Sequence, residues 1–414
     1  MAVQTQHETD RRRAPNRPAG FRDALTVREF RSLLLADSLS LLGDQITKIA
    51  IAALVYERTR SAALAATTFA LGYLPHLLGG TLLAALADRL PRRRVMVACD
   101  LGRAALVALV AVPGLPLPTV YALLFAAALL TPAFTAARAA TIPDILPGDA
   151  YVAGNALVHT LFGLGQVVGL LAGGLAVGVL GVHGALALDA TTFLASAAVI
   201  RFRLLPRPAV ARCGTSRGLL ADSADGIRLV LGDPVLRSLV LLAWCGAAFN
   251  VVPEGLAVVE AASAGHSPMV YGALLAALPA GAMVGSLAFA RLVPPATRLR
   301  LMVPVCLAGF LPLLATPLSP SLPVTAGLWF LAGTSACFQL AANAAFVQAT
   351  PEHVRARAFG VAQSGLLAVQ GLSILAAGAL AEVVDPALVV CLAGVGGLLT
   401  VGALALRWPP HGDT

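Results

Sequence analysis

Long apolar runs alternate with short polar loops along most of the chain. Each run is close to the ~20 residues that an α-helix needs to cross a bilayer. Prolines and glycines inside these runs do not exclude helices, because neighbouring helices in a bundle satisfy the freed backbone groups. The pattern predicts an all-α integral membrane protein with twelve spans, at residues 32–56, 62–86, 95–112, 118–137, 152–180, 184–200, 236–259, 269–292, 299–316, 321–345, 358–381 and 386–406.

Arginines are distributed unevenly between the loops on the two sides of this predicted bundle. The N-terminal stretch, the 2–3, 4–5, 8–9 and 10–11 loops and the central connection all carry them, and all fall on one side. The opposite loops carry Arg58 and Arg60 and otherwise mostly acidic residues. Because Lys and Arg accumulate in cytoplasmic loops, we expect both termini in the cytoplasm.

The most polar internal stretch lies near the midpoint of the chain and leaves six predicted spans on either side. Met96-Val97 recurs after it as Met302-Val303, and Arg31-Ser32-Leu33 recurs at the same separation as Arg237-Ser238-Leu239. Such matches suggest duplicated halves, as in many secondary transporters. We therefore expect a disordered cytoplasmic tail (1–20), an N-terminal half (21–200), a cytoplasmic linker (201–235), a C-terminal half (236–406) and a second tail (407–414).

Composition narrows the class of protein. Of 414 residues, 58% are hydrophobic and 12% are charged, whereas a soluble domain is about a quarter charged. The net charge of +8 comes from arginines in loops, which indicates topology signals and lipid headgroup contacts, so we expect no nucleic-acid partner. The chain has no phosphate-binding G-x-x-x-x-G-K-[S/T] motif, no H-E-x-x-H motif and no cysteine pair with metal-ligand spacing. We expect neither an enzyme nor a metal or cofactor.

The loop between the second and third predicted spans is short and strongly basic. Alone, its arginines could serve only to fix topology. With Gly80 upstream, however, the spacing resembles the loop between helices 2 and 3 of the major facilitator superfamily, although Ala84 and Pro91 replace two of its usual glycines. The resemblance implies a gating loop, formed here by Asp88, Arg89, Arg92, Arg93 and Arg94 with Asp100 and Arg103 downstream.

The fifth predicted span carries a face of small residues, Gly165, Gly169, Gly173 and Gly174. Small residues four apart let another helix approach closely, and ordinary helix packing is sufficient to explain them. The spacing also resembles the helix-5 signature of the superfamily's antiporters, with Leu170 in place of the usual proline. In those exporters this region is thought to seal the far side of the cavity, so the resemblance favours export.

Further residues resemble the drug–proton antiporter branch that includes macrolide and siderophore exporters: Leu42-Gly43-Asp44, Ile142-Pro143-Asp144, Asn155 and Asp189. The resemblance implies a major facilitator fold in a bacterial inner membrane. It also implies alternating access, with export of amphipathic small molecules driven by the proton gradient. Uptake, lipid flipping and a non-transporting sensor remain open. We expect a monomer whose partners are membrane lipids, protons and a small-molecule substrate.

Ionisable groups inside predicted spans are candidates for function, because they are costly there. Asp44 precedes Lys48 by one turn, the favourable order for a helical ion pair. Glu254 has no cation within one turn, and a desolvated carboxyl without a cation takes up a proton more readily. We therefore expect Glu254, and next Asp44, to couple protons, an order that Lys48 reaching Glu254 from another helix would reverse. Candidates to line the substrate cavity, or merely to bridge helices, are Lys48, Asn250, Gln166, Gln339 and Asn343.

Overall fold

The structure is a computed structural model of the chain and describes residues 20–73, 75, 90–207, 219–319 and 321–406. Within these ranges the regular structure is entirely helical. The first group of helices comprises α2 (Phe21–Thr26), α3 (Arg28–Thr59), α4 (Ala62–Tyr73), α6 (Arg92–Val110), α7 (Leu117–Ile145) and α8 (Asp149–Arg203).

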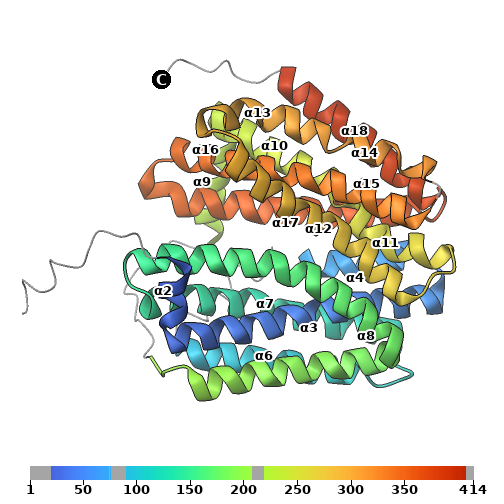
Figure 1. Ribbon diagram of the computed structural model, residues 1–414, viewed down its shortest axis with the longest axis horizontal. Helices are drawn as coiled ribbons and strands as arrows, with labels where there is room; N and C mark the ends of the chain where they lie inside the picture. Colours follow the sequence, from blue (N-terminus) through green and yellow to red (C-terminus); the bar gives the residue numbers. More distant parts are fainter. Residues whose placement is uncertain (1–19, 74, 76–89, 208–218, 320, 407–414) are drawn as a thin grey trace, which may run out of the picture.

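The second group follows the central connection and forms a separate layer, yellow-green to red in Figure 1. It comprises α9 (Leu219–Gly232), α10 (Pro234–Asn250), α11 (Val252–Ser263), α12 (Pro268–Leu292), α13 (Pro295–Ala308), α14 (Leu311–Leu314), α15 (Leu322–Thr334), α16 (Phe338–Ala349), α17 (Arg355–Leu380) and α18 (Pro386–Leu406), with 3₁₀ turns at Thr316–Leu318, Ser335–Cys337 and Glu352–Val354.

Nine helical segments of the described residues are long and apolar enough to cross a membrane. Large apolar side chains such as Leu292, Leu399 and Phe202 are exposed, as expected for surfaces that face lipid rather than water. The 55-residue α8 is more than twice as long as one crossing requires. Its backbone breaks at Gly181 (φ 70°, ψ 174°), a conformation that glycine tolerates, so α8 contains both predicted spans 152–180 and 184–200.

The seventh predicted span is broken rather than continuous. α10 ends at Asn250, and α11 begins at Val252 with Pro253 in its first turn. Proline has no N–H to continue the hydrogen bonds of the preceding turn, which explains a break at this position. Glu254 therefore lies in the first turn of a new helix, where the helix dipole favours a negative charge.

The linker predicted at residues 201–235 contains a helix that we did not predict, α9, which packs against α10 and α17. Gly226 allows this approach, since a Cβ atom there would lie 2.9 Å from Val361 and 3.0 Å from Arg357. The second half of the span predicted at 62–86 and part of the 2–3 loop lie outside the described residues.

The two groups make intimate contact at one end of the bundle. We call the end where α3 begins the proximal face and the end where α3 finishes the distal face. Near the distal face α8 meets α12, and a Cβ atom on Gly272 would lie 2.4 Å from the carbonyl oxygen of Leu170. There α17 also meets α4, and a Cβ on Gly378 would lie 2.4 Å from that of Ala66. Small residues thus bring the two groups together at this face, and Figure 1 shows the two layers meeting there, where α11 and α12 lie next to α4 and α8.

Candidate functional site

A cavity of about 410 Å³ lies among the helices of the first group and reaches Leu367 of α17. Its α3 wall runs from Asp37 to Lys48. Beyond Lys48 the helix is enclosed by packing, with Ile49, Ala50 and Ile51 fully buried. The cavity therefore occupies the proximal side of the distal contacts. Its charged lining residues are Asp37, Asp44, Lys48, Arg103, Arg138 and Asp189.

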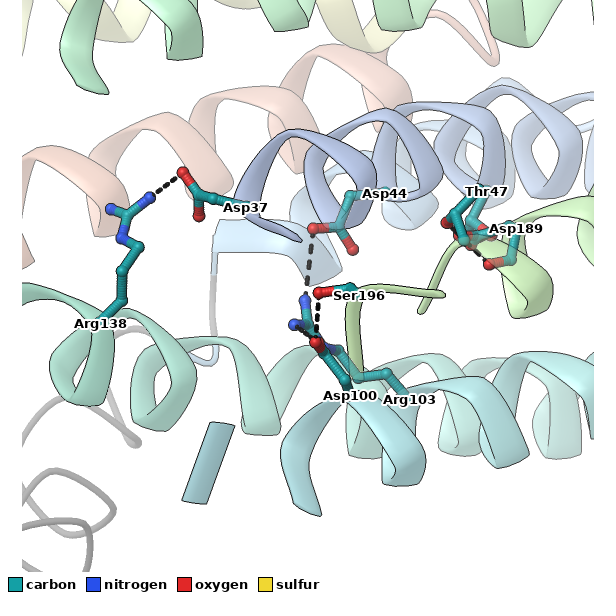
Figure 2. A network of polar contacts seen from close by, with 9 residues as sticks. Asp37, Asp44, Thr47, Asp100, Arg103, Arg138, Asp189 and Ser196 are labelled. Atoms are coloured by element: carbon teal, nitrogen blue, oxygen red, sulfur yellow. Dashed lines mark hydrogen bonds and ion pairs between the residues drawn. The ribbon is translucent and has the colours of Figure 1, made fainter. Parts of the chain in front are cut away.

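Arg103 of α6 is shared between two carboxylates (Figure 2). Its Nη2 lies 2.5 Å from Asp100 Oδ1, and its Nη1 lies 3.5 Å from Asp44 Oδ2. Ser196 Oγ also donates to Asp100, at 2.6 Å. The side chains of Asp100 and Arg103 are 0% and 2% exposed, whereas that of Asp44 is 35% exposed. Asp44 therefore has the longer contact with the cation and a face open to the cavity.

Two aromatic rings hold the Arg103 guanidinium in place. Its Cζ lies 4.8 Å from the ring centre of Phe134 and 4.5 Å from that of Phe193. A cation over an aromatic face is stabilised by the ring quadrupole, most of all when desolvated. The position of this charge is thus fixed by α7 and α8 as well as by its acidic partners.

Asp189 is a buried carboxylate bound by hydroxyl groups. Thr47 Oγ1 donates to it across the α3–α8 contact, and Thr192 Oγ1 donates at 3.1 Å. The side chain is 0% exposed, and among the described residues no cation lies within ion-pair distance of it. Gly43 makes room for it, because a Cβ at Gly43 would lie 1.9 Å from Asp189 Oδ1. The sequence signal was an aspartate in the sixth predicted span, which carries part of the resemblance to the drug–proton antiporter branch.

Lys48 pairs with Glu254 of the second group, at 3.9 Å, and not with Asp44 as its spacing suggested. Tyr73 Oη donates to the other oxygen of Glu254 at 3.0 Å. Glu254 therefore has a cation from another helix, which removes the reason for ranking it ahead of Asp44 as a proton-coupling candidate. Asp44 in turn contacts Arg103, at 3.5 Å. The proton-coupling role itself stays a prediction.

The amide candidates separate into three environments. Gln166 lines the charged cavity. Asn250 is buried and donates to Ala332 O and Ser335 Oγ, at 3.4 and 3.3 Å, within the second group. Gln339 and Asn343 line a second, smaller cavity between α10, α16 and α17. Of the predicted substrate-cavity residues, the larger cavity thus brings together only Lys48 and Gln166.

The described part of the basic loop contacts its own group. Arg92 Nη1 lies 2.5 Å from Asp144 Oδ2 and donates to the Ala140 carbonyl oxygen at 2.6 Å. Arg93 donates to the Leu204 carbonyl oxygen at 2.9 Å, while Arg94 makes no polar contact with another of the described residues. Of the other predicted gating residues, Asp100 and Arg103 belong to the cavity network, and Asp88 and Arg89 lie outside the described residues.

The glycine face of α8 serves two contacts. Gly165, Gly169 and Gly173 pack against α3, where added Cβ atoms would lie 2.6 to 3.0 Å from its side chains. Gly174 instead faces α12, and its Cβ would lie 3.0 Å from Gly272. One face thus holds the first group together, and its last glycine joins that group to the second.

A sequence model of the Major Facilitator Superfamily matches residues 33–336. The chain belongs to this superfamily. It is 29% identical over 360 residues to the multidrug efflux pump Tap of Mycolicibacterium fortuitum, covering 82% of this chain and 86% of Tap. It is 28% identical over 367 residues to Tap of Mycobacterium tuberculosis strain H37Rv, covering 84% and 86%. An uncharacterized MFS-type transporter of Bacillus subtilis, YkuC, is 26% identical over 308 residues, with 70% of each chain covered.

Solved structures share the fold at low identity. A POT family transporter in complex with 5-aminolevulinic acid superposes with a TM-score of 0.73 at 11% identity, over 92% of this chain and 96% of that one. An inward-facing bacterial homolog of the lysosomal transporter Spinster gives 0.63 at 17%, over 92% and 95%. The chain is a multi-pass membrane transporter of the major facilitator type. Among the described residues no cluster of His, Cys, Asp or Glu is arranged to hold a metal ion.

Proposed function

We propose that this superfamily member is a proton-coupled exporter of amphipathic, cationic small molecules in a bacterial inner membrane. In this proposal the chain crosses the membrane twelve times, in two six-helix halves. Its arginine-rich proximal face lies in the cytoplasm. Relatives named as multidrug efflux pumps support export. Proton coupling is supported by one observation in particular, the surplus of carboxylates over cations around the central cavity.

The surplus follows from the ion pairs. Arg138 pairs with Asp37, Lys48 with Glu254, and Arg103 most closely with Asp100. Asp44 is left with a share of Arg103, and Asp189 with hydroxyl donors. An unpaired charge in a membrane protein's interior is unfavourable, so protonation or a cationic ligand stabilises this cavity. Protons and a cationic substrate therefore compete for the same carboxylates. Because binding of one displaces the other, the transporter exchanges protons for the substrate.

The arrangement of the groups suits loading from the cytoplasm. The distal contacts close the side assigned to the exterior, and the cavity lies on the proximal side of them. Rocking of the two halves would break the distal contacts and expose Asp44 to the outside. There, entry of a proton onto the carboxylate would displace the cation and favour its release.

Transport into proteoliposomes tests the proposal. We expect ethidium to accumulate against its gradient when a pH gradient is imposed, and Asp44→Asn to abolish this accumulation. Asp385→Asn, in a distal turn away from the cavity, is the matched control and should behave as wild type. Ethidium flux in wild-type protein that ignores the pH gradient would contradict proton coupling. A growth screen in a pump-deleted host is a second test. If expression of this protein protects the host against none of the toxic cations screened, export is contradicted.

A further inference from the structure

A second cavity, of about 120 Å³, lies between α10, α16 and α17. We call it the amide pocket. Among the described residues, its lining has no charged side chain, in contrast to the larger cavity. The two are neighbours, since Leu366 lines the amide pocket and Leu367, the next residue of α17, lines the charged cavity. The side chains that carry the argument are Trp244, Gln339, Asn343, Phe346, Phe359 and Gln363.

The three amides have open hydrogen-bonding capacity. Among the described residues, none donates to or accepts from the side chains of Gln339, Asn343 or Gln363, and the last two are exposed. A carboxamide offers two donors and an acceptor, and facing lipid with these unmet is unfavourable. These donors and acceptors are satisfied when the three amides line a cavity that water or a ligand enters.

The aromatic walls are held in fixed positions. Trp244 Nε1 donates to the Ala362 carbonyl oxygen at 2.9 Å, so the indole presents only its ring to the pocket. Gly365 gives that ring its place, because a Cβ there would lie 2.0 Å from Trp244 Cζ2. Phe346 and Phe359 pack edge to face, 5.5 Å apart. Rigid aromatic faces contribute contact area with little loss of side-chain freedom.

Flat apolar walls and free amides select a specific chemistry. An uncharged ring fits when its faces are apolar and its edge carries hydroxyl or amide groups, because both sets of surfaces are then matched. The volume of about 120 Å³ is of the same order as the roughly 150 Å³ of an apolar cavity that holds one benzene molecule, so it limits the occupant to a single ring. Among the described residues, the lining offers no side chain of opposite charge to neutralise an ionic group.

We propose that the amide pocket is a substrate subsite that takes an uncharged, hydroxyl- or amide-bearing ring while the charged cavity holds a cationic group of the same molecule. This inference rests on the proposed function and narrows its substrate class. Cations that carry such a ring are then bound in preference to simple amphipathic cations.

Equilibrium binding to protein in lipid nanodiscs tests the inference with a matched pair of radiolabelled probes. One is dodecyltrimethylammonium, and the other is the same cation with a glucosyl group at the end of its chain. We expect wild type to bind the glucosyl probe about tenfold more tightly, the effect of one or two well-matched hydrogen bonds. Gln363→Leu and Asn343→Leu should each remove most of this preference and change dodecyltrimethylammonium binding less than about twofold.

Gln348→Leu, an exposed amide of α16 outside the pocket, is the control and should keep the preference. Equal affinity of wild type for both probes, or equal losses in the Gln348 and Gln363 variants, would overturn the subsite. Failure of both cations to bind would instead count against the proposed function. In that case uncharged dodecyl glucoside decides the subsite: binding that Gln363→Leu weakens and Gln348→Leu does not supports it, and any other result overturns it.

Discussion

Replacing Glu382 should open the distal face of the transporter. Glu382 lies in the turn between α17 and α18, and its Oε1 accepts hydrogen bonds from Ser61 Oγ (2.6 Å) and from the backbone N–H of Ala63 (2.8 Å), at the start of α4. The carboxylate thus caps a helix of the first group from the second group. It lies beside the contact between Gly378 and α4, which belongs to the closed distal seal.

The size of the effect follows from helix capping. Loss of a side-chain cap costs about 0.5–2 kcal/mol, and the charge adds about 0.3–1 kcal/mol through the helix dipole. Glu382 is exposed, so solvent screening places the sum near the lower end. A loss of about 1 kcal/mol makes the distally closed state about fivefold less favoured relative to the open state. We expect this fivefold change in the variant Glu382→Ala.

The contact also predicts a response to pH. The hydrogen bond from Ser61, followed by that from Ala63, holds the pKa of Glu382 below its ordinary value of 4.5 in the closed state. Deprotonated Glu382 therefore stabilises closure above pH ~4.5, and this contribution disappears as the pH falls through the lowered pKa. Acidifying the distal side should shift wild type toward the open state. In Glu382→Ala this acid-induced shift should be smaller, because the Glu382 carboxylate no longer contributes to it.

Spin labels at Val112 and Leu318 in a cysteine-free background measure the opening. Both residues are exposed and near the distal face, one in each group. We expect Glu382→Ala to increase the population of long distances. Asp385→Ala is the matched control, because Asp385 lies in the same turn but caps α18 of its own group. Unchanged distances in Glu382→Ala, or the same change in both variants, would refute the reasoning.

Three further predictions concern the distal seal and the cavity. Gly272→Ala places a Cβ atom 2.4 Å from a backbone oxygen of α8 and should lengthen the same spin-label distances, whereas Gly360→Ala, with open space around it, should not. Arg103→Met leaves Asp100 buried without its cation, so it should lower the unfolding free energy by about 3–5 kcal/mol, measured by thermal unfolding in detergent. Asp100→Asn in the same chain should restore much of the loss, and a double variant as unstable as the single would contradict this account. Glu254→Gln releases Lys48 from its ion pair; it should weaken pH-driven accumulation in proteoliposomes and retain downhill exchange, and uphill transport at the wild-type rate would show that Glu254 is not needed for coupling.

Several of the spans were predictable because their cause is local. Backbone groups in hydrocarbon must be satisfied within the segment, so an apolar run of sufficient length becomes a helix whatever surrounds it. The run at 386–406 corresponds to α18 (Pro386–Leu406), and that at 269–292 to α12 (Pro268–Leu292). The family resemblance had the same basis, because the motifs that carry it are short and contiguous. The broken span at Val251 also had a visible signal, Pro253.

The pairing of charges was decided only in three dimensions. On sequence spacing Asp44 and Lys48 form a pair, yet Lys48 contacts Glu254, and Asp44 contacts Arg103. Each observed partner lies on a different helix, and helix rotation and packing determine which one is within reach. The same reason separates Gln339 from Gln166, which sequence alone assigned to one cavity and the fold places in two. Hydropathy fixes where a helix lies along the chain, but the direction in which each polar side chain points depends on helices distant in sequence.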